Sequence, residues 1–153
     1  MDFVNVIIRL LHILSAIGLL GGTIFVVFAL VPTLSHIEPE LRVAIFSRAK
    51  KRFYRVAHPA IILLIVTGAY SWGQNARAYE AYTDQNGPML QALLGLKVLL
   101  AVIVTVLVFA DTFKMLPPPA TSWPKINLVL GLVIVLLASI IRMMHMQVLT
   151  LSQ

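Results

Sequence analysis

Long apolar runs alternate with short polar stretches along the chain. Four runs, at residues 4–31, 53–73, 90–113 and 125–147, each reach the length of about 20 residues that a helix needs to cross the hydrocarbon core of a bilayer. The pattern therefore predicts an all-α fold, a four-helix, up-down integral membrane bundle that forms a single domain over residues 1–153.

The composition supports this class. Apolar residues make up 59% of the 153 positions and charged residues 12%, and the mean hydropathy is +0.92, whereas a soluble domain carries about a quarter charged residues. The chain contains no cysteine, which excludes disulfides and thiolate metal sites. The net charge of +6 is not accompanied by a nucleic-acid motif or interleaved aromatic residues. We therefore expect the lipid bilayer as a partner, and no nucleic acid.

The connections between the runs predict how the chain is oriented. Residues 32–52 form the first connection, with room for one short helix, and six basic residues lie between Arg42 and Arg55. Basic connections next to apolar spans usually remain in the cytoplasm. The second connection, at residues 73–88, is polar and nearly neutral and is expected outside. These features predict an integral membrane protein with both termini outside, which in a bacterial inner (plasma) membrane is the periplasmic side.

The first apolar run contains two groups that stand out, Arg9 and His12. An ionisable side chain inside a membrane span is a functional-site hypothesis, because it is costly to bury without a partner. Steps of three or four residues from His12 give a stripe of small or weakly polar side chains, which is predicted to face the other helices: Ser15, Ala16, Leu19, Gly22 and Thr23. Gly18 and Gly22 have the spacing that lets helices approach closely.

Helical rise predicts which of the other charged residues lie at the depth of His12. At 1.5 Å per residue, His12 lies about 12 Å from the outer end of the first span and Lys97 about 11 Å from the outer end of the third. Arg9 lies one turn outward of His12, and Arg142 and His145 occupy the last turns of the fourth span. These five residues are predicted to converge on the outer half of the bundle. Each cation also has an ordinary explanation, since its side chain can extend to the membrane surface.

Two other ionisable residues are predicted to lie away from this group. His58 belongs to the inner end of the second span, where a packing role is the ordinary explanation. Asp111 lies about 21 Å along the third helix from Lys97, so it is not expected to neutralise that lysine.

Two ligands would account for the outer group. For a haem or other porphyrin, His12 and His145 would bind the metal, and Lys97, Arg9 and Arg142 would bind the propionates.

Copper(I) is the alternative ligand, because thioethers and imidazoles suit this ion. Its ligands would be His12, Met143, Met144, His145 and Met146, although methionines at a helix end also serve as ordinary apolar filling. The neighbouring cations would repel a copper ion, which favours the porphyrin on electrostatic grounds.

Short motifs in three of the spans resemble those of a known family. The chain resembles the CopD copper-resistance membrane proteins in the following segments: Leu11-His12 followed by Gly21-Gly22, Arg52-Phe53-Tyr54-Arg55 followed by Pro59, Thr67-Gly68 followed by Tyr70, and Leu94-Gly95-Leu96-Lys97. More distantly it resembles the HemJ-type protoporphyrinogen oxidases, whose helix-one histidine and helix-three lysine match His12 and Lys97. Residues 91–97 lack the histidine that the HemJ family places near its lysine.

These resemblances imply different activities. The CopD resemblance implies copper import or copper tolerance, often beside a periplasmic copper chaperone. The HemJ resemblance implies a bound b-type haem and oxidation of a porphyrinogen, and only in that case would Lys97 be catalytic. Our first hypothesis is a CopD-like protein that handles copper, and the second is a haem-binding membrane redox protein. The third is a non-catalytic membrane subunit that packs on a partner or on a second copy of the chain.

Overall fold

The computed structural model describes residues 3–81, 87–113, 115 and 122–151, and their side chains except at 75–81, 87, 122 and 145–151. These residues form the helices α1 (Phe3–Phe25), η1 (Val26–Leu30), α2 (Val31–Leu34), α3 (Pro39–Ala81), α4 (Gly87–Thr112) and α5 (Ser122–Leu151), where η1 is π-helical. No strand occurs in the described ranges. Four segments are long and apolar enough to cross a membrane: Phe3–Leu34, Pro39–Gln74, Pro88–Thr112 and Trp123–Met144. The predicted all-α class is thus confirmed, with four candidate spans.

The second helix is much longer than predicted. We expected it to begin near residue 53 and to end near residue 73, but α3 is continuous from Pro39 to Ala81. Residues 40–58 contain neither Gly nor Pro, so nothing in their local chemistry ends a helix. The change from polar to apolar residues near 53 therefore does not mark the start of a helix. It marks the point at which one continuous helix passes from polar to apolar surroundings.

The first helix also continues past the point where it was expected to stop. Pro32 has no N–H, and its ring crowds the carbonyl four residues earlier. The chain accommodates the proline by widening to a π-helical turn in η1, where the Val31 N–H donates to the carbonyl of Val26. α2 follows directly and places Pro32 in its first turn, where the missing donor costs nothing. α1, η1 and α2 thereby form one helical rod.

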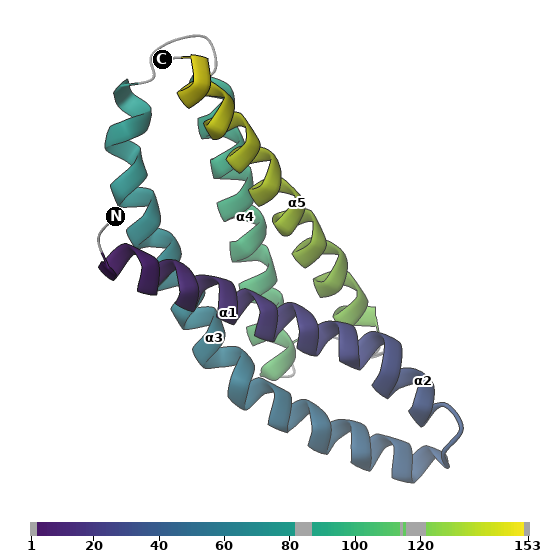
Figure 1. The fold of residues 1–153 in the computed structure, drawn as a ribbon. Helices are drawn as coiled ribbons and strands as arrows, with labels where there is room; N and C mark the ends of the chain where they lie inside the picture. Colours follow the sequence, from purple (N-terminus) through teal and green to yellow (C-terminus); the bar gives the residue numbers. More distant parts are fainter. Residues whose placement is uncertain (1–2, 82–86, 114, 116–121, 152–153) are drawn as a thin grey trace.

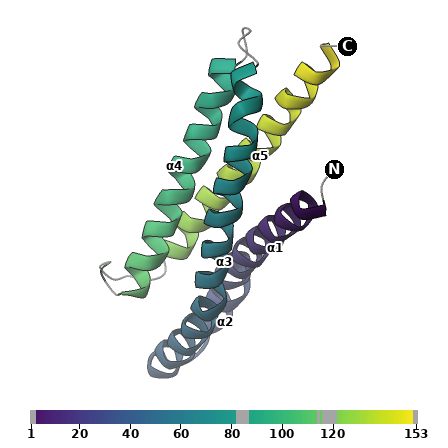
Figure 2. The same cartoon turned by 90° about the vertical axis from the view of Figure 1, so that its left-hand side faces the viewer.

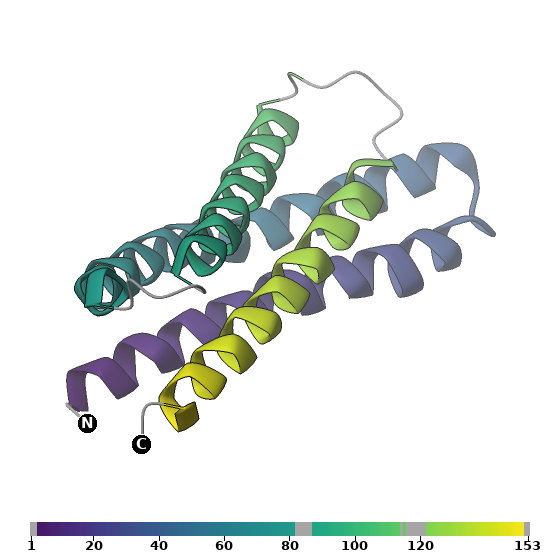
Figure 3. The same ribbon diagram turned by 90° about the horizontal axis from the view of Figure 1, so that it is seen from above.

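The rods are arranged as two pairs (Figure 1). α1 and α2 run beside α3, α4 runs beside α5, and the contacts within each pair are the most extensive in the molecule. Figures 2 and 3 show that the turn joining α2 to α3 extends beyond the ends of α4 and α5 on that side. α3 changes direction part-way along its length (Figure 1), and Pro59 within it is the residue type that causes such bends.

Small residues allow the helices to come close at two points. An added Cβ at Gly22 would overlap Cε2 of Phe53, so the Phe53 ring of α3 occupies the space that a side chain at Gly22 would need. In the same way a Cβ at Gly131 would lie 3.1 Å from Cδ1 of Leu20, where α5 crosses α1. An added Cβ at Gly18 would meet nothing within 4 Å. Of the predicted glycine pair, Gly22 alone makes a close approach.

The predicted inward stripe of the first helix is confirmed. Ser15 is 7% exposed, and the other stripe residues are all half-buried. Leu10 and Ile17, on the opposite side, are 53% and 61% exposed. Periodicity therefore assigned the faces of this helix correctly, because a helix repeats its direction every three to four residues.

The Gly22–Phe53 contact can be tested with a matched pair of variants. Gly22→Ala is expected to reduce the free energy of unfolding by about 1–2 kcal/mol, because the methyl group must displace the Phe53 ring. Gly21→Ala is the control, since its added Cβ meets nothing within 4 Å. Reversible unfolding in mixed detergent micelles, followed by circular dichroism, measures both. Equal stability of the two variants would contradict the packing described.

Candidate functional site

His12 makes its main polar contact with the third helix. Its Nδ1 lies 2.7 Å from Oγ1 of Thr67, a residue that is 4% exposed. Thr67 is on α3, so the contact joins α1 to α3 through two residues that are 55 positions apart in the sequence. The imidazole is thus held on the face where α1 and α3 meet, as the stripe through His12 predicts.

The hydrogen-bond network determines which nitrogen of the neutral imidazole carries the proton. The Thr67 hydroxyl donates to the carbonyl of Leu63, four residues earlier. A hydroxyl has one hydrogen to donate, so Thr67 Oγ1 must accept from His12. His12 therefore carries its proton on Nδ1, and Nε2 keeps a free lone pair. Fixing one nitrogen through a second residue is the usual way in which proteins orient a metal-binding histidine.

Two further residues complete the surroundings of the ring. An added Cβ at Gly68 would lie 3.6 Å from Cε1 of His12, so the imidazole lies against the bare backbone of α3. Lys97 of α4 is half-buried and lies close enough to His12 for the two side chains to interact electrostatically. An imidazole and a lysine side chain therefore lie near each other among otherwise apolar helices.

The other predicted site residues do not all gather at His12. Arg9 and Arg142 are exposed, and Met143 is 59% exposed. Met144 packs instead against the apolar cluster that joins α4 to α5, around Leu90 and Ile141, together with Leu93 and Leu94. His145 and Met146 belong to the α5 backbone, but their side chains lie outside the described residues. No three His, Cys, Asp or Glu side chains come together as a metal site in the described part of the chain.

A second polar cluster lies between α3 and α4, and its centre is Asp111. Lys50 Nζ lies 2.6 Å from Asp111 Oδ1, and the Tyr54 hydroxyl donates to Asp111 Oδ2. The Lys50 and Asp111 side chains are 23% and 10% exposed. The Lys50 ammonium also lies 5.7 Å from the centre of the Tyr54 ring, within the range of a cation–π contact. Asp111 thus neutralises Lys50 and satisfies Tyr54 at once.

His58 extends this second cluster and has no part in the first. Its Nε2 lies 3.3 Å from Oγ1 of Thr112, and its ring lies 4.9 Å from that of Phe109, measured between centroids. It also stacks on Tyr54 at 5.7 Å. Its position with Asp111 matches the prediction that His58 lies away from the His12 group, and a packing role accounts for its contacts.

Sequence reasoning missed the partners in both clusters. Thr67 belongs to one of the motifs that resemble the CopD family, but no local signal links it to His12. Lys50 lies in the basic connection and Asp111 lies near the end of the third apolar run, and their opposite charges are a usable signal. The signal is easily missed, because Lys50 belongs to a basic run that is typical of a connection between membrane spans.

Comparisons with known proteins add no relatives: no family model, no curated protein and no solved structure matches this chain.

The Asp111 cluster makes a prediction about stability. Asp111→Ala is expected to reduce the free energy of unfolding by about 2–3 kcal/mol, because it leaves a largely buried Lys50 ammonium without its counter-charge. Adding Lys50→Met should restore part of that loss, since the unpaired charge is then gone. Detergent-induced unfolding of the two single variants and the double variant measures the coupling. Lys51→Met is the control for removing a neighbouring exposed charge. Additive effects of the Asp111 and Lys50 changes would show that the pair is not coupled.

Proposed function

We propose that this chain is an integral membrane protein that binds a metal through His12, and that the metal is the iron of a b-type haem. The observation that carries the proposal is the orientation of His12. Its Nδ1–H donates to Thr67, so Nε2 keeps a lone pair that no described residue uses, and a histidine fixed in this way by a second residue would be able to hold the iron of a haem.

The chemistry of the surrounding side chains supports a porphyrin. Lys97 places a positive charge near His12, and a cation there would repel a bare copper ion but attract the carboxylate of a propionate. The residues present therefore fit an anionic porphyrin: His12 would hold the iron and Lys97 a propionate. A bound haem would supply one-electron redox chemistry. The protein's own contributions are to orient the imidazole, to provide the counter-charge and to surround both with apolar helices.

Copper handling of the CopD type is the second candidate, and one observation favours it. Met143 is 59% exposed, so its thioether is not used in packing and is open to a soft metal ion. In this candidate the ligands are those named from the sequence, with Met144 leaving its apolar cluster to take part. A periplasmic chaperone would then be the source of the ion.

We also propose an up-down arrangement in the bacterial inner membrane with both termini in the periplasm. It rests on the six basic residues between Arg42 and Arg55 and on the positive-inside rule. Alkaline phosphatase, which is active outside the cytoplasm, should be active when fused after Gln153. The same enzyme inserted at His36, in the turn between α2 and α3, should be inactive. The reverse pattern would overturn this orientation.

The metal is identified by a visible spectrum of the detergent-purified protein, oxidised and then reduced with dithionite, with copper quantified on the same sample. We expect a Soret band with sharp bands in the reduced state, because a b-type haem is bound. His12→Ala should remove the Soret band, and Lys97→Met should weaken haem retention by about tenfold, the loss typical of a charge-assisted contact. His36→Ala is the control, since His36 is an exposed histidine in a turn.

Each other outcome has a defined meaning. A His12→Ala protein that keeps its full haem content would refute His12 as the ligand. Stoichiometric copper without a Soret band, lost when Met143, Met144 and Met146 are changed to Leu, would establish the copper candidate instead. A protein with neither metal would leave the non-catalytic membrane subunit as the remaining hypothesis.

A further inference from the structure

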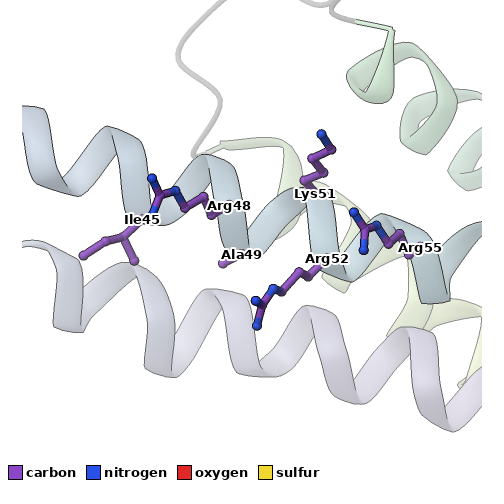
Figure 4. A pocket seen from close by; sticks show the side chains of 6 residues that line it. All are labelled: Ile45, Arg48, Ala49, Lys51, Arg52 and Arg55. Atoms are coloured by element: carbon purple, nitrogen blue, oxygen red, sulfur yellow. The ribbon is translucent and has the colours of Figure 1, made fainter.

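A hollow lined by cations runs along the first half of α3, well away from His12. Its volume is about 460 Å³, and its lining consists of Ile45, Arg48, Ala49, Lys51, Arg52 and Arg55. Figure 4 shows the four charged side chains along this part of α3, with Lys51 and Arg52 extending in opposite directions across the helix. We call these four cations the basic face of α3.

The spacing of the four cations explains why they lie together. Relative to Arg48, the others follow at positions +3, +4 and +7, which is the spacing of neighbours on one side of a helix. Like charges at these separations repel one another. The arrangement therefore destabilises the helix unless an anion lies among the cations.

The protein does not supply that anion within its described residues. All four cations are exposed, and none of them forms a salt bridge or a hydrogen bond in the parts of the chain that the structure describes. The contrast with Lys50 is direct, because this residue of the same run turns toward α4 and pairs with Asp111. Of the cations in this part of α3, Lys50 thus has a partner within the protein, whereas the four cations of the basic face are exposed.

The chemistry of the basic face indicates which anion fits. Three of its four cations are arginines, whose planar guanidinium groups bind phosphate oxygens in pairs. Ile45 and Ala49 line the same hollow, so an apolar surface adjoins the charges. Beyond Arg55 the helix becomes apolar, which places the basic face where a membrane-crossing helix meets the headgroup layer.

We propose that the basic face of α3 is a binding site for a phosphate group, carried by the headgroup of an anionic phospholipid. The Arg48 and Arg52 guanidinium groups bind the phosphate, Lys51 and Arg55 add charge, and Ile45 and Ala49 contact the apolar part of the lipid. The site is independent of whatever His12 binds.

Native mass spectrometry of the detergent-solubilised protein tests the proposal. Dioleoylphosphatidylglycerol is titrated against dioleoylphosphatidylcholine at about 0.15 M salt, where long-range attraction is screened. The wild type should retain the anionic lipid in preference to the zwitterionic one. Arg52→Gln should weaken that retention about fivefold, and Arg48→Gln with Arg52→Gln about thirtyfold, from the contribution of one basic residue near a membrane surface.

Two control variants separate a site from general attraction. Lys125→Gln removes one exposed charge at the start of α5 and should leave lipid retention unchanged. Arg52→Lys keeps the charge but loses the paired donors, so it should weaken retention measurably but less than Arg52→Gln. An equal loss of lipid retention in Lys125→Gln and Arg52→Gln would overturn the proposal. It would show that the lipid is attracted by the overall surface charge and not by a site on the basic face.

A soluble probe distinguishes the source of the phosphate. Inorganic pyrophosphate is added to the wild type in detergent without lipid, and thermal unfolding is followed. Stabilisation by phosphatidylglycerol that exceeds any given by pyrophosphate supports a lipid headgroup. Stabilisation by pyrophosphate alone, lost in Arg48→Gln, would overturn the lipid source and assign the site to a soluble phosphate compound.

Discussion

The free energy of placing a polar group in hydrocarbon governs how these helices contact one another. Thr67 illustrates this constraint, since its hydroxyl donates to the Leu63 carbonyl and also accepts from His12, so both hydrogen-bonding functions of the hydroxyl are used. Other hydroxyls on the apolar helices donate to carbonyls of their own helix, as Thr23 does to Leu19 and Thr105 to Ala101. Within the described residues, the interhelical polar contacts are few and specific, and they decide which faces meet.

Two such contacts, at different levels of the structure, have different chemical characters. At Thr67 the result is an oriented neutral imidazole with one lone pair to offer, close to the charge of Lys97. At Asp111 the result is a closed set in which every member has a partner: an ammonium, a phenol and a carboxylate. Such a closed set stabilises a helix pair, whereas the His12 imidazole keeps one nitrogen without a partner among the described residues, and that nitrogen is available to a ligand. The difference is why the candidate site is placed at His12 and not at His58.

Most of the apolar surface of the helices is not covered by the protein itself. In the most apolar window of each candidate span, between 6% and 22% of the residues are buried. Leu10, Val102 and Leu136 are each more than half exposed. In a soluble protein such surface would be destabilising, but in lipid it is the expected outer face. The helices are joined instead by close packing, such as the contact between Gly22 and Phe53. In lipid, moving an apolar side chain from the acyl chains to another helix gains little free energy, so close packing becomes the main attraction between helices.

The sequence by itself determined the number of apolar helices, the inward face of the first one and the separation of His58 and Asp111 from the His12 group. Each of these follows from the 3.6-residue period and the 1.5 Å rise of a helix, which depend only on local geometry. The tertiary structure decided that Thr67 is the partner of His12, that Lys50 turns inward to Asp111 while its neighbours face outward, and that Met144 packs in an apolar cluster. It also showed that α3 continues through the basic run. Partners that are 55 or 61 residues apart depend on where two rods cross, and no local pattern contains that information.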